Sequence, residues 1–411
     1  MNNRFLRVWI PSFGVLYAIF SCSDSQANTS SEDISMHLYR CFATPLALFG
    51  TLLISCAASA VTPAVVTGAV ANQANETIEP YQPRFARTQP VVVVVGDNGG
   101  TELTDFVIPF GVLSASGVAQ VVSVSTAPGT VKMFPALKVQ AQYTLQHFDE
   151  MYPLGADYVI VPATSDKNSA DLIKWLTAQS AKGSSLVSIC NGALTLARTG
   201  LMDGHRATAH WASERSRAAE FPGVRWQKNL RYVADGKIIS SAGISASLPV
   251  SIALVEAIAG TQKANELAAE LGVTDWSATH NSDAFQQASD DPSMSWRVQR
   301  KAPAHLNIPL SEGMDEIALA LRAEAYTHSG AVQVNTVSQN TDPVTTRHNL
   351  LVIPDKQIVI VGPQASALNL HSAAVPSAKA LDVALQELAD EYGSTAAAQA
   401  ARVMEYPLFL P

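Results

Sequence analysis

Five short, continuous apolar runs constrain the fold of this chain more than any other feature. They are separated by segments whose apolar residues recur at helical spacing. Strands buried on both faces show such continuous runs, and they occur in parallel sheets that helices cover on both sides. The sequence therefore predicts an α/β fold with a doubly wound, mostly parallel sheet. The expected strands are residues 91–95, 118–124, 158–161, 186–189 and 237–240.

The chain of 411 residues is long enough for more than one domain. A segment rich in proline and small or polar residues precedes the first strand, and a stretch rich in Ser, Asp and Pro later interrupts the α/β pattern. We expect a signal or anchor region (1–61), a linker (62–90), the main α/β domain (91–272), an irregular connection (273–309) and a smaller α/β part (310–411).

The C-terminal part reads as a shortened copy of the main domain. The run MDEIALALRAEAYTHSGAVQVNTVS echoes LTDFVIPFGVLSASGVAQVVSVS, with Glu316 at the place of Asp105. A final segment puts Leu381, Leu385 and Leu388 on one apolar face, as a closing helix would. A degenerate half-repeat is one interpretation. Chance similarity between two amphipathic α/β segments is the other, because short apolar periodicities recur widely.

Cys190 lies at a predicted turn between a strand and a helix. Residues 186–189 form the strand, and Asn191-Gly192 permits a sharp turn into the helix. Such an elbow exposes a nucleophile and directs helix N-terminal N–H groups toward its sulfur. We therefore expect the thiolate to be favoured, with a Cys190 pKa below that of free cysteine. The other interpretation is structural, since free cysteine usually packs as a small apolar side chain.

Three further segments have distinctive sequences besides the elbow segment around Cys190, LVSICNGALTLARTG. TELTDFVIPFGVLSASG puts Asp105 in the first turn of a helix, GLMDGHRATAHW puts His210 20 residues after Cys190, and GKIISSAGISAS is a small-residue loop after another strand. Over roughly residues 90–272 these segments resemble the ThiJ/PfpI superfamily, which has the class I glutamine amidotransferase-like, flavodoxin-like fold. The similarity is greatest to the amidase-like domain of AraC-type regulators and to isocyanide hydratases.

The resemblance implies roles for three side chains. By position, Cys190 is the nucleophile, Asp105 is the acid that touches it, and His210 is a nearby base or orienting residue, with Trp211 part of the same signature. Taken without the resemblance, Asp105 could simply stabilise its helix N-terminus, and His210 could be a packed histidine beside Trp211.

Backbone amides at Asn191 and at the turn after the third strand would form the oxyanion hole that the resemblance implies. The family usually has Pro-Gly-Gly at that turn, whereas this chain has Pro162-Ala163-Thr164. The loss of both glycines restricts the backbone at Ala163 and Thr164. The departure puts full catalytic competence in question.

Asp105, protonated beside a Cys190 thiolate, suits addition to a polarised carbon. One interpretation is a cysteine-dependent hydrolase or lyase that acts on a small electrophilic carbon by hydratase, amidase or glyoxalase-like chemistry, without a cofactor. A second is a non-catalytic domain that senses a small ligand, regulates or acts as a scaffold. A third is a redox sensor or stress protein in which Cys190 is oxidised. The family resemblance also implies a homodimer, and the other histidines show no metal-ligand spacing.

The formal net charge of −8 argues against nucleic acid as a partner, because phosphate binding requires a basic face. No basic run is present in the sequence, and no helix-turn-helix pattern follows the main domain. In the regulators that the main domain resembles, the DNA-binding part would lie there.

Two apolar stretches near the N-terminus, residues 8–20 and 42–60, each follow arginine. The second has the features of a signal peptide starting at Met36, with Ala58-Ser59-Ala60 as the cleavage site. Lipid attachment at Cys56, in Leu53-Ile54-Ser55-Cys56, and an uncleaved membrane anchor are the alternatives. Export to the periplasm or attachment to a membrane is expected in each case, and cleavage after Ala60 would leave Cys190 as the one cysteine.

Overall fold

The computed structural model describes residues 76–287, 303–358 and 375–407, which all belong to one compact unit, Thr67–Pro411. The expected signal or anchor region lies outside the described residues. Among the residues that are described, no helix has the length and apolarity needed to cross a membrane.

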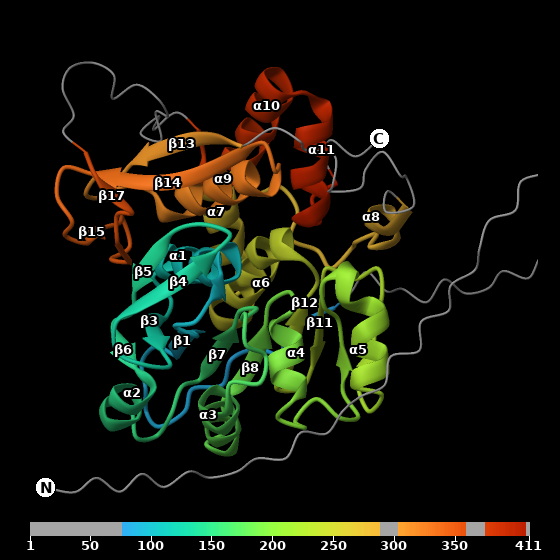
Figure 1. Cartoon of the computed structure of the whole chain (residues 1–411). Coiled ribbons are helices and arrows are strands. Elements are labelled where there is room, and N and C mark those ends of the chain that lie inside the picture. The colour runs from blue at the N-terminus through green and yellow to red at the C-terminus, as the bar shows by residue number, and fades with distance from the viewer. Residues whose placement is uncertain (1–75, 288–302, 359–374, 408–411) are drawn as a thin grey trace, which may run out of the picture. The chain divides into compact units, whose positions relative to one another are not determined.

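A seven-stranded sheet forms the centre of the main domain (Figure 1). Its strand order is β11-β12-β8-β7-β1-β3-β6, and every neighbouring pair is parallel except β11 with β12. The predicted doubly wound, mostly parallel sheet is therefore confirmed, and the five expected strands are all present. Those strands are β1 (Val91–Gly96), β3 (Gln120–Ser125), β7 (Tyr158–Val161), β8 (Ser185–Ser188) and β12 (Ile238–Ser241), and the others in the sheet are β6 (Tyr143–Thr144) and β11 (Tyr232–Asp235).

Alternate residues of the central strands, such as β1 and β7, enter two different cores. Val92 and Val94 of β1 pack with α1 and α6 on one face, whereas Val93 and Val95 pack with α2, α3 and α4 on the other. Strands covered on both faces explain why the sequence shows unbroken apolar runs. The helices of the main domain are α1 (Leu103–Ser116), α2 (Leu145–Met151), α3 (Ala170–Ala181), α4 (Gly192–Ala197), α5 (Glu214–Glu220), α6 (Ser247–Ala259) and α7 (Thr261–Leu271), and α8 (Asp283–Gln287) follows them.

The C-terminal part is also α/β. Its strands β13 (Ala304–Pro309) and β14 (Val332–Ser338) are parallel, and α9 (Glu316–His328) connects them. The expected irregular connection ended at residue 309, but β13 already begins at Ala304. That strand was missed because most of its side chains are exposed or half-buried, so it lacks a continuous apolar run. The remaining elements are β17 (Lys356–Gln357), α10 (Ala380–Tyr392) and α11 (Ser394–Val403).

The main domain and the C-terminal part share a core and a sheet. Helix α9 packs on α1, where a Cβ on Gly111 would lie 2.7 Å from Ile317 Cγ1, so this glycine permits the close crossing. The second sheet, of five strands, has the order β15-β16-β5-β4-β2 and takes strands from both parts. Its strands are β2 (Thr101–Glu102), β4 (Thr130–Phe134), β5 (Lys138–Gln140), β15 (Val344–Thr345) and β16 (Leu351–Val352), and a short two-stranded sheet joins β9 (Arg206–Ala207) to β10 (Arg225–Trp226).

The start of α9 shows which residue matches Asp105. The N-cap side chains Glu102 and Asp315 accept hydrogen bonds from the amides of Asp105 and Ala318, respectively. Counted from these caps, Ala318 occupies the position of Asp105, two residues beyond Glu316. The half-repeat stays a prediction, and Glu316 is not the counterpart of the acid.

The described end of the expected linker packs on the main domain. Ile78 is buried in the larger core, and the Arg87 guanidinium lies 2.6 Å from the Asp157 carboxylate. The Tyr81 amide donates to the Ala257 carbonyl at 2.8 Å. Residues 76–90 therefore pack on the folded body, and the linker expected over residues 62–90 stays a prediction. The other residues of the expected linker lie outside the described ranges.

Candidate active site

Cys190 forms the elbow between β8 and α4. Its backbone has φ 53°, in the left-handed region that residues other than glycine rarely adopt. The turn is tight on its other side as well, because a Cβ on Gly192 would lie 2.0 Å from the Val161 carbonyl oxygen. Strand β8, the glycine and the neighbouring β7 thus fix the cysteine above the carboxyl ends of the parallel strands, where α/β folds place their sites.

Asp105 lies at the same end of the sheet, in the first turn of α1. One carboxylate oxygen, Oδ2, accepts a hydrogen bond of 3.0 Å from the Ala163 amide. The other oxygen, Oδ1, is buried without a hydrogen-bond partner. A fully buried carboxyl oxygen without a partner is unusual, because an unsatisfied acceptor costs about 1–3 kcal/mol.

The Cys190 thiol is buried, and its surroundings favour the neutral form. Burial raises the pKa of Cys190 well above its ordinary value, and the carboxylates of Asp105, Glu102 and Glu405 raise it further. The Asn191 amide opposes this shift only in part. Burial and the neighbouring Glu102 also raise the pKa of Asp105. The expected low thiol pKa is therefore wrong for this conformation, since desolvation and three acids outweigh the short helix α4.

His210 is buried and both of its ring nitrogens have partners. The Ala212 amide donates to Nδ1 at 3.1 Å, which leaves the proton on Nε2 to be donated to the Val403 carbonyl at 2.9 Å. Burial lowers the pKa of His210, so the neutral imidazole is favoured. These bonds hold the C-terminal segment against the main domain, and the role of His210 as a base or orienting residue stays a prediction.

The three expected oxyanion residues differ in what they offer. The Ala163 amide already donates to Asp105, and the Thr164 hydroxyl lies 3.2 Å from the hydroxyl of Thr195. Asn191 precedes α4 and its amide acts on the cysteine sulfur, while its buried side-chain oxygen Oδ1 has no partner. Of the three, the Asn191 backbone is the group best placed to serve an anion at the elbow.

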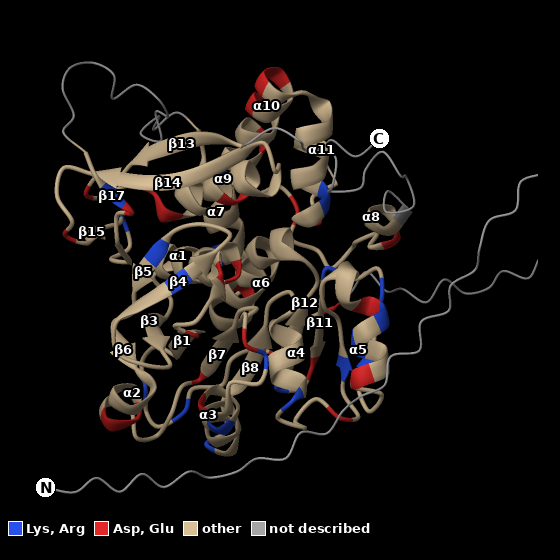
Figure 2. Ribbon diagram, viewed as in Figure 1, with Lys and Arg blue, Asp and Glu red and all other residues tan. Residues whose placement is uncertain are grey.

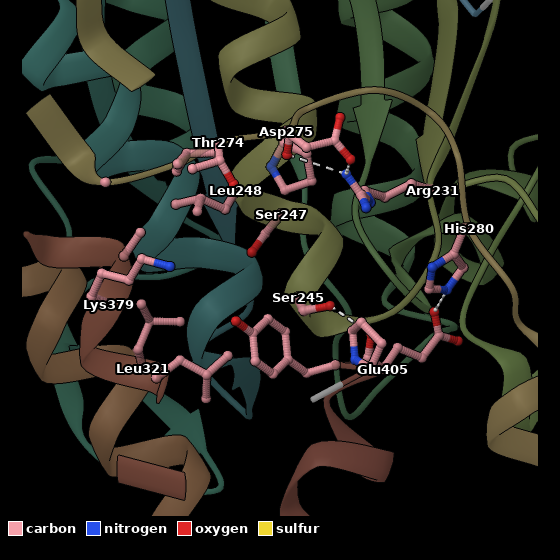
Figure 3. Close-up of a pocket in the computed structure, with 17 residues that line it drawn as sticks. Arg231, Ser245, Ser247, Leu248, Thr274, Asp275, His280, Leu321, Lys379 and Glu405 are labelled. Carbon is pink, nitrogen blue, oxygen red and sulfur yellow. Dashed lines mark hydrogen bonds and ion pairs between the residues drawn. The ribbon is translucent and has the colours of Figure 1, made fainter. Parts of the chain in front are cut away.

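Glu405 brings a charge to this site from the far end of the chain. Its side chain is fully buried and accepts hydrogen bonds from the Trp211 amide at 2.5 Å and the Gly243 amide at 2.6 Å. It also accepts a hydrogen bond from His280 Nε2 at 3.0 Å (Figure 3). Although burial raises its pKa, the bond to His280 and the other donors leave the pKa of Glu405 below its ordinary value. The carboxylate is therefore charged at neutral pH.

We call residues 402–405 the C-terminal clamp, because their backbone and side chains hold several loops of the main domain. The Met404 carbonyl accepts from the Ser245 amide at 2.8 Å, and the Arg402 guanidinium lies 4.9 Å from the centre of the Trp211 ring. Beside the clamp lies a pocket of about 230 Å³ that Ser245, His280 and Glu405 help to line (Figure 3). Cys190 is not among the residues that line this pocket.

Sequence reasoning missed Glu405 and Arg217. The buried Arg217 guanidinium donates to the His210 carbonyl at 2.6 Å, and the charges of Glu405 and Cys190 act on it. Arg217 lies in the charged run ERSRAAE, which is typical of an exposed helix, and Glu405 follows a poorly distinctive alanine-rich segment. Neither position carries a local signal of burial.

Basic and acidic side chains are interspersed over the described elements, and the exposed end of α10 is acidic (Figure 2). Its acids include Glu387, Asp390 and Glu391. The expectation that nucleic acid is not a partner stays a prediction, as does the expected homodimer.

Residues 89–257 match the sequence model described as the DJ-1/PfpI family. Among curated proteins, the chain is 34% identical over 93 residues to the HTH-type transcriptional regulator CdhR of Pseudomonas aeruginosa, and 31% identical over 103 residues to the isonitrile hydratase of Pseudomonas putida. These alignments cover 23% and 25% of this chain and 27% and 42% of the two relatives, respectively. The chain therefore matches less than half of either relative's length.

Two solved structures of low sequence identity align with part of this chain. Toxoplasma gondii DJ-1 in an oxidized form is 23% identical, with a TM-score of 0.40, and the alignment covers 45% of this chain and all of that structure. An AraC family transcriptional regulator from Pseudomonas putida is 18% identical, with a TM-score of 0.39, over 44% of this chain and 98% of that structure.

Proposed function

Residues 89–257 are a DJ-1/PfpI family domain, and on this premise we propose that the chain is a cysteine-dependent enzyme that adds water to a small electrophilic carbon. Cys190 is the nucleophile and Asp105 carries its proton. The observation that supports this most directly is the strained elbow: a cysteine held at φ 53° over the strand ends, with the free oxygen of a buried acid in the same site.

The proposed step is an addition of the thiol across an unsaturated carbon. The Cys190 Sγ–carbon bond forms while one π bond of the carbon breaks. Protonated Asp105 gives its proton to the substrate, and the thiol proton takes its place on Asp105. Water then attacks the same carbon, the carbon–sulfur bond breaks, and the thiol is regenerated, so that the net reaction is hydration. The curated relative named isonitrile hydratase makes a small isonitrile the first substrate to test.

A non-catalytic ligand-sensing domain is the second candidate, and one observation favours it. Cys190 is only 4% exposed, and the Glu405 carboxylate adds an unfavourable charge to thiolate formation. A site closed in this way is better suited to sensing a bound ligand than to repeated conversion of a substrate. The enzyme proposal requires the C-terminal clamp to open before the substrate reaches the sulfur.

Alkylation of Cys190 by iodoacetamide, followed by peptide mass mapping from neutral to strongly alkaline pH, tests the proposal on the full-length chain. We expect slow labelling at neutral pH and a rise only at pH values above the ordinary pKa of free cysteine, because burial and the neighbouring acids raise the thiol pKa. Asp105→Asn removes one of those charges and should move the midpoint to lower pH. Glu316→Gln is a matched control, since Glu316 is an equally buried acid that pairs with His348.

Hydration of a small aliphatic isonitrile by the wild type and its loss in Cys190→Ser would support the enzyme. If Cys190 were labelled only when the protein unfolds, and no isonitrile were consumed, the enzyme proposal would be wrong and the ligand-sensing domain would replace it.

A further inference from the structure

We propose that Glu102, Glu324 and His328 form a site for a divalent transition-metal ion between the main domain and the C-terminal part. Each residue offers one ligand atom, and the three atoms all lie within 4.8 Å of one another. The site adjoins the elbow through Glu102, whose carboxylate also acts on Cys190, but the metal proposal does not depend on the elbow chemistry proposed above.

Two packed helices bring the three side chains together. Glu102 is the N-cap of α1, whereas Glu324 and His328 are one turn apart on α9 and therefore lie on the same helix face. The close crossing of α1 and α9 at Gly111 fixes the two helices against each other. The ligands thus come from rigid elements more than 200 residues apart in the chain, which is why spacing along the sequence did not reveal them.

The hydrogen bonds at this site leave ligand oxygens free. Glu102 Oε2 accepts from the Asp105 amide at 2.6 Å, while its Oε1 is buried without a partner. Glu324 Oε2 accepts from the Thr104 amide at 2.9 Å, and its Oε1 lies 3.3 Å from His328 Nε2 without forming a hydrogen bond. A buried, unpartnered carboxylate oxygen is the feature that points to a missing ligand.

The charge of the site also calls for a cation. Glu102 is 3% exposed and Glu324 is 0% exposed, and within the described ranges neither forms an ion pair with a lysine or arginine. Two ionised carboxylates buried this close together repel each other, and a cation between them removes that repulsion. A divalent ion bound by two carboxylates and a neutral imidazole makes the site neutral overall.

The ligand set indicates the class of metal. Imidazole suits zinc and its first-row neighbours, whereas magnesium and calcium prefer sites made of oxygen alone. Three protein ligands are typical of zinc sites that keep an open fourth position for water or a small molecule. The His328 side chain is 23% exposed while that of Glu324 is fully buried, so the ion would enter from the His328 side.

Titration of metal-free, full-length protein with Co²⁺ tests the proposal, because Co²⁺ reports its ligands through visible d–d absorption and its affinity by calorimetry. We expect one Co²⁺ per chain, displaced by Zn²⁺. His328→Gln and Glu324→Gln should each weaken Co²⁺ binding by at least about 100-fold, because loss of a partner that only orients a ligand already costs about 10–100-fold. Circular dichroism checks that each variant is folded, and the partly exposed His328 is the safer of the two changes.

Glu316→Gln is the matched control. Glu316 is another buried glutamate of α9 that pairs with a histidine, but among the described residues it belongs to no cluster of three ligand-forming side chains. Its Co²⁺ affinity should equal that of the wild type. Folded wild-type protein that binds no Co²⁺, or Co²⁺ bound equally well by His328→Gln, overturns the proposal. Two carboxyl groups sharing a proton would then be the alternative at Glu102 and Glu324.

Discussion

Removing the Glu405 carboxylate should destabilise the protein and make Cys190 accessible. The change Glu405→Ala deletes the acceptor of three hydrogen bonds, from the Trp211 and Gly243 amides and from His280. All three donors stay in the protein and lose their partner. The main domain would then lose its hold on the C-terminal clamp.

The size of this effect can be worked from the contacts. Hydrogen bonds to a charged group contribute about 1.5–3 kcal/mol each, so that three bonds set an upper range of about 4.5–9 kcal/mol. Glu405 also lines the pocket beside the clamp, so water can reach part of the vacated space. We therefore expect the free energy of unfolding to fall by about 3–5 kcal/mol, as when one partner of a buried ion pair is removed.

Urea unfolding followed by circular dichroism measures this loss, and iodoacetamide labelling of Cys190 under native conditions measures the opening. Glu405→Gln keeps an acceptor oxygen of the same shape and should cost about half as much. Glu220→Ala removes a half-exposed acid paired with Arg198 and should cost at most about 1 kcal/mol. A loss below about 1 kcal/mol in Glu405→Ala, with unchanged labelling, would refute the idea that this carboxylate holds the site closed.

Three further results are expected. Gly192→Ala should destabilise the fold by about 3 kcal/mol or more in urea unfolding, because the new Cβ would lie 2.0 Å from the Val161 carbonyl oxygen; a loss under about 1 kcal/mol would contradict the tight elbow. Burial lowers the pKa of His210, so the unfolded state takes up a proton first as pH falls below about 6.5. Between pH 7 and pH 5 the free energy of unfolding should therefore fall more in the wild type than in His210→Gln. The difference is at most about 1.4 kcal/mol per pH unit. Finally, mass spectrometry of the chain expressed in a Gram-negative bacterium should find a mature N-terminus at Val61 if cleavage follows Ala60. A lipid-modified Cys56 is expected if lipid is attached there, and an uncleaved N-terminus if the segment is an anchor. An uncleaved chain that stays in the cytoplasm would contradict export.

The sequence predicted those features that depend on short segments. The strands were legible because continuous apolar runs are unusual outside doubly covered sheets. The elbow at Cys190 and the first-turn position of Asp105 could also be predicted, because each depends only on the strand and helix next to it in the sequence. That both lie at one end of the sheet follows from parallel strand direction alone.

Features that depend on distant segments were missed or misjudged. The thiol pKa was expected to fall, but it rises because burial and carboxylates from two distant segments act on Cys190: Glu102 and Asp105 at the start of α1, and Glu405 near the C-terminus. Nothing in the local sequence could show that Glu405 would be buried beside residues near position 210. The counterpart of Asp105 in α9 was placed two residues early because the match was made between the acids at the two helix starts. Alignment of Gly117 with Gly330 after the helices puts Ala318 at that place.

The pairing of β16 with β5 has a consequence for how the protein is made. Leu351 pairs with Gln140, so one edge of β5 has no neighbour until roughly 200 further residues have been synthesised, a separation typical of slowly forming contacts. At ordinary translation rates this takes roughly 10–40 seconds. During that time the nascent main domain presents an open strand edge and an uncovered α1, which are the surfaces that promote aggregation. The main domain therefore completes its fold only after the C-terminal part has been synthesised.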